Sequence, residues 1–218
     1  MAQSKIINNT KSGNYVSDNS VFILDKFSPD TSNELIGNLA DIVMEMPECP
    51  VYQISGKIES PYKLIDNNRP VIDVYINSNG GSGYILDSIV MLLGIAKSRG
   101  AIIRTTVLSR AASCGSLLAI TGTPGYRIMY SQAYHFIHFG NHALNASKED
   151  EIQMAAKHIK EAANNKQNMY LQHTNLTAKE LKKLQSNEQG HMNAQTCLDK
   201  GLCDWIITDF GDIIGRSR

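Results

Sequence analysis

Hydrophobic positions along the chain alternate between short runs typical of strands and longer segments with helical spacing. The short runs predict strands at residues 21–24, 71–77, 101–109, 126–130 and 133–139. The longer segments predict helices from about residue 31 to Pro47, at 84–98, at 116–120, at 147–172 and at 177–186. A short helix, a glycine turn and a strand then close the domain at residues 193–207. Because strands and helices alternate, we expect an α/β fold with right-handed crossovers.

Three segments carry more specific expectations. Residues 84–98 are apolar nearly all round, which predicts a buried helix that Gly100 ends. Residues 147–172 carry one narrow apolar stripe, which predicts a helix that is exposed or packs on a partner. The stripe consists of Ile152, Ala156, Ile159, Ala163 and Tyr170. Residues 1–20 are polar and rich in asparagine, so we expect a flexible arm there and a single domain over 21–218.

Composition excludes several classes of protein. The 218 residues include 21 basic and 21 acidic side chains, so net charge gives no attraction to nucleic acid or to an anionic membrane. The four cysteines form neither a CxxC pair nor a zinc-binding spacing, and we expect reduced thiols. The sequence shows neither a signal peptide nor an apolar run long enough to span a membrane. These features predict a soluble, cytoplasmic protein.

A glycine pair is the first candidate for chemistry. Gly80 and Gly81 follow a predicted strand and precede a helix, in the stretch INSNGGSG. Their N–H groups could stabilise a developing negative charge, although a tight turn that needs positive φ explains the pair equally well. The stretch lacks the lysine of a P-loop and the dinucleotide fingerprint, which argues against a nucleotide.

Small residues surround Ser113 and Cys114 in the stretch SRAASCGS, also between a strand and a helix. Packing is one explanation, because small residues let a helix start close to a sheet. The other is a nucleophile with N–H groups nearby and a base within reach. His138 ends a predicted strand and could act as that base, whereas His135 lies on the opposite face of the strand. No cluster of Cys, His and Asp has metal-ligand spacing, so we expect neither a metal nor a cofactor.

Taken together, these stretches resemble the ClpP family of self-compartmentalising serine proteases. The glycine turn INSNGGSG, the turn AASCGS, the histidine motif FIHF and the closing segment NAQTCLDKGLCDWII occur in the family's order. The 25-residue separation of Ser113 and His138 is typical of the family. The resemblance runs from about Val71 to Ile207. It implies the ClpP/crotonase-like fold of repeated β-α-β units, with residues 147–172 as the protruding handle helix.

The resemblance also implies a function. Ser113 matches the nucleophile and His138 the general base, while the N–H groups of Gly81 and Cys114 match the oxyanion donors. The family is an ATP-independent endopeptidase core that cleaves peptides and unfolded proteins, needs no cofactor, and assembles as two stacked seven-membered rings. An AAA+ unfoldase serves the chamber. Asp73 stands where the family's docking pocket has an aromatic residue, which would disfavour an apolar docking loop.

No aspartate stands at the place of the third member of the family's catalytic triad. Depending on the alignment, its place falls on Asn187, Glu188 or Gln189 in the stretch SNEQGH. Only Glu188 could stabilise an imidazolium by charge, and losing the carboxylate lowers rates by orders of magnitude. The alternative to a peptidase is therefore a catalytically weak or inactive ClpP-like assembly subunit. A crotonase-like acyl-CoA enzyme, which also uses a glycine pair, is disfavoured by the Ser–His spacing.

Overall fold

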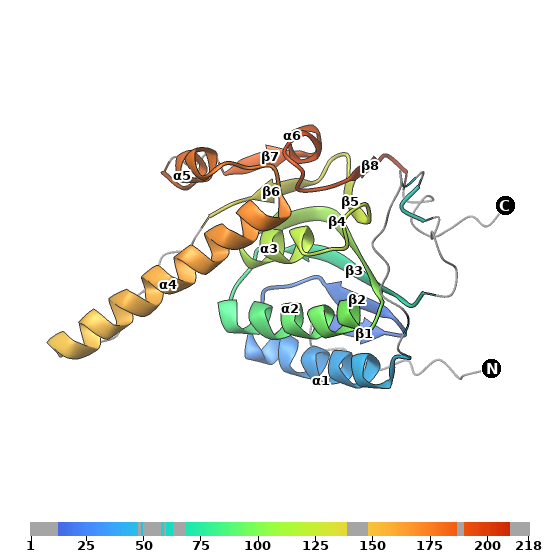
Figure 1. Ribbon diagram of the computed structural model, residues 1–218, viewed down its shortest axis with the longest axis horizontal. Coiled ribbons are helices and arrows are strands. Elements are labelled where there is room, and N and C mark those ends of the chain that lie inside the picture. The colour runs from blue at the N-terminus through green and yellow to red at the C-terminus, as the bar shows by residue number, and fades with distance from the viewer. Residues whose placement is uncertain are drawn as a thin grey trace.

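A mixed sheet runs through the molecule, with helices on both of its faces (Figure 1). The computed structural model describes residues 13–47, 49, 58, 60–62, 69–138, 148–186 and 190–209. The strands are β1 (Asn14–Ser17), β2 (Ser20–Ile23), β3 (Val71–Ser78), β4 (Ile102–Ala112), β5 (Arg127–Tyr130), β6 (Tyr134–Phe136), β7 (His191–Asn193) and β8 (Trp205–Ile207). The helices are α1 (Pro29–Glu45), α2 (Gly83–Ser98), α3 (Cys114–Ile120), α4 (Glu149–His173), α5 (Ala178–Ser186) and α6 (Ala194–Asp199).

The strand order confirms the predicted α/β class. Strands β2, β3, β4, β5 and β8 run parallel, and β1 and β7 pair antiparallel with β2 and β6. The long strand β4 carries two neighbours in series: its residues 105–107 pair with β5 and its residues 110–112 pair with β6. Strand β6 therefore leaves the line of β5 and follows the end of β4 (Figure 1).

The main core lies between the sheet and the helix pair α1 and α2. Alternate residues of β3 point into it, because successive side chains of a strand face opposite sides. The buried apolar residues are Ile72, Val74 and Ile76 of β3, Leu35, Leu39 and Val43 of α1, and Ile85, Leu86, Ile89 and Leu93 of α2. Helix α2, predicted to be buried, is buried on one side only: Tyr84 and Met91 remain 64% and 60% exposed, since the helix lies on one face of the sheet.

The amino-terminal segment differs from the expectation of an arm over 1–20. Residues 14–17 form β1, while residues 1–12 lie outside the described part of the chain. Asn14 is the reason, since its buried side-chain amide donates to the Lys26 carbonyl at 3.0 Å and to Ser32 Oγ at 3.1 Å. Its oxygen accepts the Asp25 N–H at 2.9 Å. An asparagine that looks like a loop residue in sequence thus ties β1 to α1.

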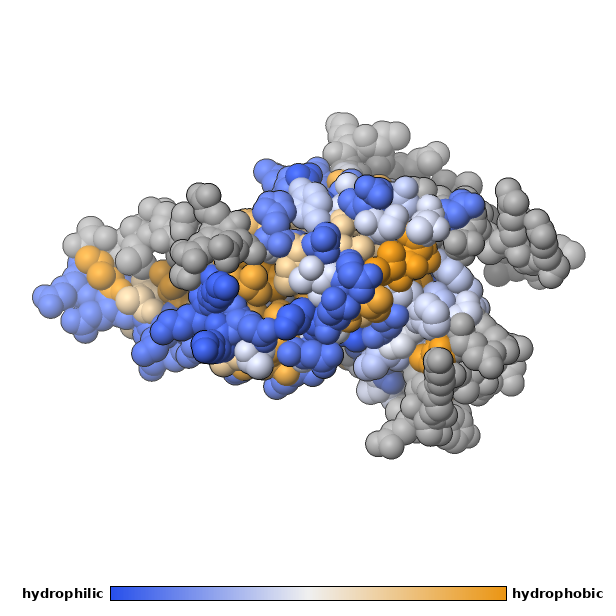
Figure 2. Space-filling model, turned by 90° about the horizontal axis from the view of Figure 1, so that it is seen from above, coloured by the Kyte–Doolittle hydropathy of each residue, from blue (hydrophilic) through white to orange (hydrophobic). Residues whose placement is uncertain are grey.

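The first and the longest helices start slightly away from the predicted positions. Helix α1 begins at Pro29, where Ser28 and Thr31 form the capping box, rather than at about residue 31. Helix α4 spans Glu149–His173, close to the predicted 147–172. It projects from the body, and among its described side chains only Tyr170 is buried (Figure 1). Apolar atoms interrupt the hydrophilic surface towards its projecting end (Figure 2).

No helix in the described ranges combines the length and the apolar character needed to cross a bilayer. The four cysteines are free thiols. The segment between Pro50 and Pro70, whose short alternating runs and turn residues predict a hairpin or a loop, lies mostly outside the described residues.

Candidate active site

Ser113 occupies a strained turn between β4 and α3. Its backbone has φ 52° and ψ −118°, a conformation that side-chain-bearing residues rarely adopt and that costs about 1–3 kcal/mol. The Ser113 N–H donates to the Phe136 carbonyl of β6 at 2.9 Å, which holds the turn against the sheet. In the nucleophile elbow of α/β-hydrolases, a serine on a sharp strand-to-helix turn has an exposed hydroxyl.

The glycine pair packs directly against this turn. A Cβ at Gly80 would lie 2.6 Å from Ser113 Cβ and 2.9 Å from the Cys114 nitrogen, so no side chain fits there. Both glycines also have positive φ, 92° and 141°. The sequence left a tight turn and a charge-stabilising loop equally open, and the structure shows that this turn needs glycine and also meets Ser113.

Phe27 fixes the orientation of the loop. Its N–H donates to the Gly80 carbonyl and its carbonyl accepts the Ser82 N–H, both at 2.8 Å. The backbone hydrogen bonds recorded among the described residues use neither the Gly81 N–H nor the Cys114 N–H. The oxyanion role that the sequence predicts for these two N–H groups stays a prediction.

The Cys114 thiol is poorly suited to be the nucleophile. It is 1% exposed and donates to the Gly81 carbonyl at 3.1 Å. Burial raises the pKa of the thiol, and the Lys166 ammonium opposes that rise only in part. A buried and protonated thiol is inert, so the geometry favours the Ser113 hydroxyl.

His138 leaves the sheet at the same edge as Ser113. Ala112 pairs with Phe136 in parallel strands, so the residues that follow them emerge side by side. The His138 ring lies against Phe136 with their centroids 5.3 Å apart. Partial burial of the ring, and then the Lys166 ammonium, lower the pKa of His138. The imidazole is therefore neutral at neutral pH and able to accept a proton.

His135 has a structural environment, as its predicted position on the other strand face implies. It is fully buried, and its Nδ1 lies 2.9 Å from Ser116 Oγ. The Tyr170 hydroxyl donates to the same Ser116 oxygen at 2.9 Å. Desolvation lowers the pKa of His135 to about 3, so this ring stays uncharged and links β6, α3 and α4.

The three candidates for a third triad member, Asn187, Glu188 and Gln189, lie outside the described residues. The next residue along the chain is described: the Gly190 carbonyl accepts the Ile137 N–H at 2.9 Å. The chain that follows these candidates is therefore hydrogen-bonded to the residue immediately before His138.

Lys166 is a neighbour of this site that the sequence interpretation missed. A Cβ placed on Gly83 would lie 3.9 Å from Lys166 Cε and 4.0 Å from its Nζ. The sequence did contain a signal for Lys166. At 100° per residue around the helix, it lies within about 40° of the apolar stripe on α4. A lysine on the inward face of an amphipathic helix breaks the local pattern, and such breaks concentrate at functional sites.

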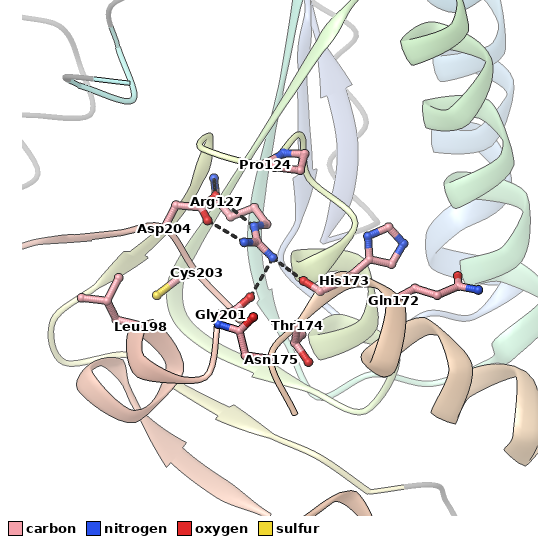
Figure 3. Close-up of a pocket in the computed structure, with 10 residues that line it drawn as sticks. All are labelled: Pro124, Arg127, Gln172, His173, Thr174, Asn175, Leu198, Gly201, Cys203 and Asp204. Atoms are coloured by element: carbon pink, nitrogen blue, oxygen red, sulfur yellow. Dashed lines mark hydrogen bonds and ion pairs between the residues drawn. The ribbon is translucent and has the colours of Figure 1, made fainter. Parts of the chain in front are cut away.

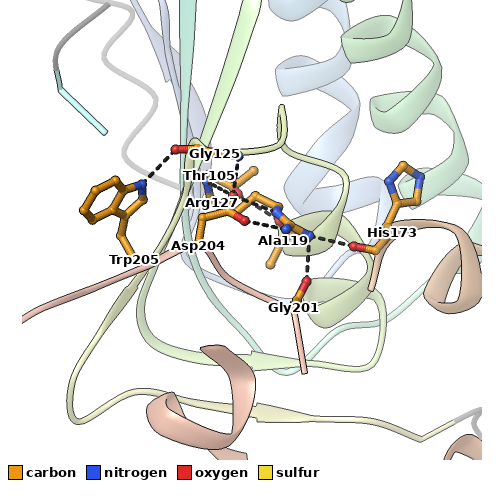
Figure 4. Close-up of polar contacts among 8 residues, drawn as sticks. All are labelled: Thr105, Ala119, Gly125, Arg127, His173, Gly201, Asp204 and Trp205. Carbon is orange, nitrogen blue, oxygen red and sulfur yellow. Dashed lines mark hydrogen bonds and ion pairs between the residues drawn. The ribbon is translucent and has the colours of Figure 1, made fainter. Parts of the chain in front are cut away.

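A pocket of about 480 Å³ lies elsewhere, at the carboxyl end of α4 (Figure 3). Arg127 and Asp204 form an ion pair at 2.5 Å in its wall. The Arg127 guanidinium also donates to the carbonyls of His173 at 2.7 Å and Gly201 at 2.8 Å (Figure 4). These groups satisfy one another, and neither Ser113 nor His138 lines the pocket, so it is a structural junction.

Within the described ranges, no group of three or more His, Cys, Asp and Glu side chains is arranged to hold a metal ion.

Comparison with known proteins identifies the family. The chain is 27% identical over 145 residues to an ATP-dependent Clp protease proteolytic subunit of Streptococcus thermophilus, covering 66% of this chain and 71% of that protein. It is 28% identical over 137 residues to the ATP-dependent Clp protease proteolytic subunit 2 of Streptomyces coelicolor, covering 63% and 61% respectively. The profile of the Clp protease family matches residues 62–210. Because that match covers more than half of the chain, the protein belongs to the Clp protease family.

Proposed function

We propose that the protein is a serine endopeptidase that cleaves peptides and unfolded chains. The observation that carries this proposal is the strained backbone of Ser113, which the sheet holds against the glycine pair. A fold accepts such strain where the position of one side chain matters more than local stability. No cofactor is needed for this chemistry.

The proposed reaction has two stages. Ser113 Oγ attacks the peptide carbonyl while His138 accepts the hydroxyl proton, and the oxyanion receives the N–H groups of Gly81 and Cys114. The C–N bond then breaks, and His138 protonates the leaving amine. A water molecule attacks the acyl-serine with the same base, which releases the acid and restores the hydroxyl.

The identity of the third triad member decides how active the enzyme is. Among the candidates, Glu188 is the only carboxylate, and Asn187 or Gln189 could only orient the His138 ring. The absence of an aspartate in this stretch favours one second candidate function, a catalytically weak or inactive assembly subunit of the same fold.

We infer that the protein acts as rings of identical subunits, seven-membered and stacked in pairs as in the family the sequence resembles. Support comes from the amino-terminal part of α4, where Ile152 of the apolar stripe is 40% exposed. A helix with an uncovered apolar stripe gains stability by packing on another copy.

An AAA+ unfoldase is the proposed partner, and the neighbourhood of Asp73 bears on its docking. Phe22 stacks on Tyr75 with their centroids 5.0 Å apart. The Asp73 carboxylate, on the same strand as Tyr75, is bound at both oxygens by Arg104, at 2.5 and 2.8 Å. The carboxylate is thus neutralised within the fold, which lessens the penalty that the sequence predicts for an apolar docking loop.

The test uses a fluorophosphonate probe and a short fluorogenic peptide. We expect the full-length protein to be labelled at Ser113 and to cleave the peptide, and Ser113→Ala to lose both properties by at least about a thousandfold in rate. The matched control is Cys114→Ala, which keeps the backbone N–H and should retain labelling. Intact rings without labelling would contradict the peptidase and support the assembly subunit.

A further inference from the structure

We propose that Lys166 selects peptides with an acidic side chain on the residue whose carbonyl Ser113 attacks. This inference rests on the proposed peptidase function and deepens it by naming a substrate class. It starts from a cationic group next to the reaction centre that the proposed mechanism does not use.

The position of Lys166 follows from how α4 is fastened. Tyr170 lies one turn later on the same face of the helix, and its hydroxyl is anchored to Ser116 of α3 at 2.9 Å. Ser116 is two residues after Cys114, so Lys166 approaches the start of α3 from the side of α2. A Cβ built on Gly83 would lie 4.0 Å from Lys166 Nζ, so the ammonium lies beside the glycine turn.

Among the described residues, no acidic side chain lies within ion-pair distance of Lys166. Its side chain is half-buried. Asp87, one turn into α2, raises the pKa of the Cys114 thiol and so opposes the effect of Lys166 there. Lys166 also lowers the pKa values of both Cys114 and His138, as expected of a cation close to both groups.

The geometry of attack indicates which part of a substrate meets this cation. The carbonyl oxygen must lie at the N–H groups of Gly81 and Cys114, and the leaving amine must face His138. The side chain on the acyl side leaves from the neighbouring Cα, next to the backbone of Gly81 and Gly83. A carboxylate there would meet the Lys166 ammonium, while a basic side chain would be repelled.

The experiment compares peptides with blocked ends that differ only in carrying Glu, Gln or Lys before the cleaved bond. For the unaltered protein, we expect kcat/KM for the Glu peptide to exceed that for the Gln peptide by about tenfold. Lys166→Met keeps the length of the side chain without its charge and should reduce this ratio to about one. Lys166→Glu should favour the Lys peptide. The control Lys157→Met alters the same helix on its opposite face, about 13 Å along the axis, and should leave the ratio unchanged.

Three outcomes would overturn the proposal. The first is a ratio of kcat/KM for the Glu peptide to that for the Gln peptide near one in the unaltered protein. The second is a ratio that stays unchanged in Lys166→Met. The third is loss of turnover of all three peptides in Lys166→Met, which would make Lys166 a base.

A binding measurement tests the selection of acidic peptides separately from the proposed peptidase activity. The Ser113→Ala protein should bind the labelled Glu peptide about tenfold more tightly than the Gln peptide in fluorescence anisotropy, and the difference should vanish in Ser113→Ala with Lys166→Met. Tighter binding without any cleavage by the unaltered protein would refute the peptidase but support acidic selection. Equal binding would refute the selection, whatever the activity.

Discussion

His138 and Cys114 share one cationic neighbour but end up in different states. Burial lowers the pKa of the imidazole and raises the pKa of the thiol, and Lys166 lowers both. Near neutral pH the imidazole is consequently uncharged and the thiol stays protonated. This combination suits a hydroxyl nucleophile with a neutral base, not a thiolate paired with an imidazolium.

The lowered pKa of His138 predicts the acid side of the pH–rate profile. A base with a lowered pKa keeps its deprotonated form to lower pH, so the midpoint of the fall in kcat/KM for a neutral peptide should lie below the ordinary histidine value of 6.5. Lys166→Met removes the smaller of the two causes, so the acid limb should move to higher pH yet remain below the ordinary histidine value. Rates between pH 4 and 8 measure this, with Lys157→Met as the control. An acid limb that stays in place in Lys166→Met would contradict the role assigned to the ammonium.

Individual site residues differed in how far the sequence could predict them. Strand ends and small residues predicted the places of Gly81, Ser113 and His138, because parallel strands deliver their carboxyl ends to one edge. Lys166 comes from a helix whose direction the sequence does not specify, so its approach to Gly83 was visible only in three dimensions.

At the scale of elements, α4 is fastened to the body by two polar clusters near its carboxyl end. One links Tyr170 to Ser116 and His135, and the other links the His173 carbonyl to Arg127. Short strands were the hardest elements to predict. Strands β1 and β7 have four and three residues, too few for an alternating pattern to stand out, and Asn14 of β1 looks like part of a loop.

The ion pair between Arg127 and Asp204 should contribute strongly to stability. Both side chains are mostly buried, 10% and 19% exposed, so Asp204→Asn leaves a buried guanidinium without its counter-charge. We expect the free energy of unfolding to fall by about 3 kcal/mol, measured by urea denaturation. The matched control is Glu180→Gln, whose pair with Lys200 has the same 2.5 Å separation but is exposed, and which should cost far less. Equal losses in the two variants would show that burial does not govern the strength of these pairs.

At the scale of the whole molecule, α4 gives the subunit its projecting shape (Figure 1). The apolar stripe predicted a helix that is exposed or packs on a partner, and the structure confirms the helix. Fold class was predictable because strands and helices alternate along the chain. The path of β6 along the end of β4 was not, since no local pattern distinguishes it from a strand beside β5.

A charge placed on the stripe should disrupt the proposed assembly without unfolding the subunit. Ile152 is 40% exposed in the single chain, so Ile152→Lys loses little burial within the subunit but places an ammonium in the proposed contact between rings. We expect analytical ultracentrifugation to show single rings in place of stacked pairs, with an unchanged circular dichroism spectrum. Glu161→Lys introduces the same side chain on the opposite face and should keep the stacked form. Stacked rings in Ile152→Lys would exclude this face as the contact.

The conformation of Ser113 sets stability against function at a single position. Glycine adopts φ 52° without penalty, so a chain under selection for stability alone would carry glycine there and gain about 1–3 kcal/mol. A serine in that place means that the other interactions of the domain compensate for one unfavourable residue. The margin available for destabilising changes elsewhere in the sequence is reduced by the same amount.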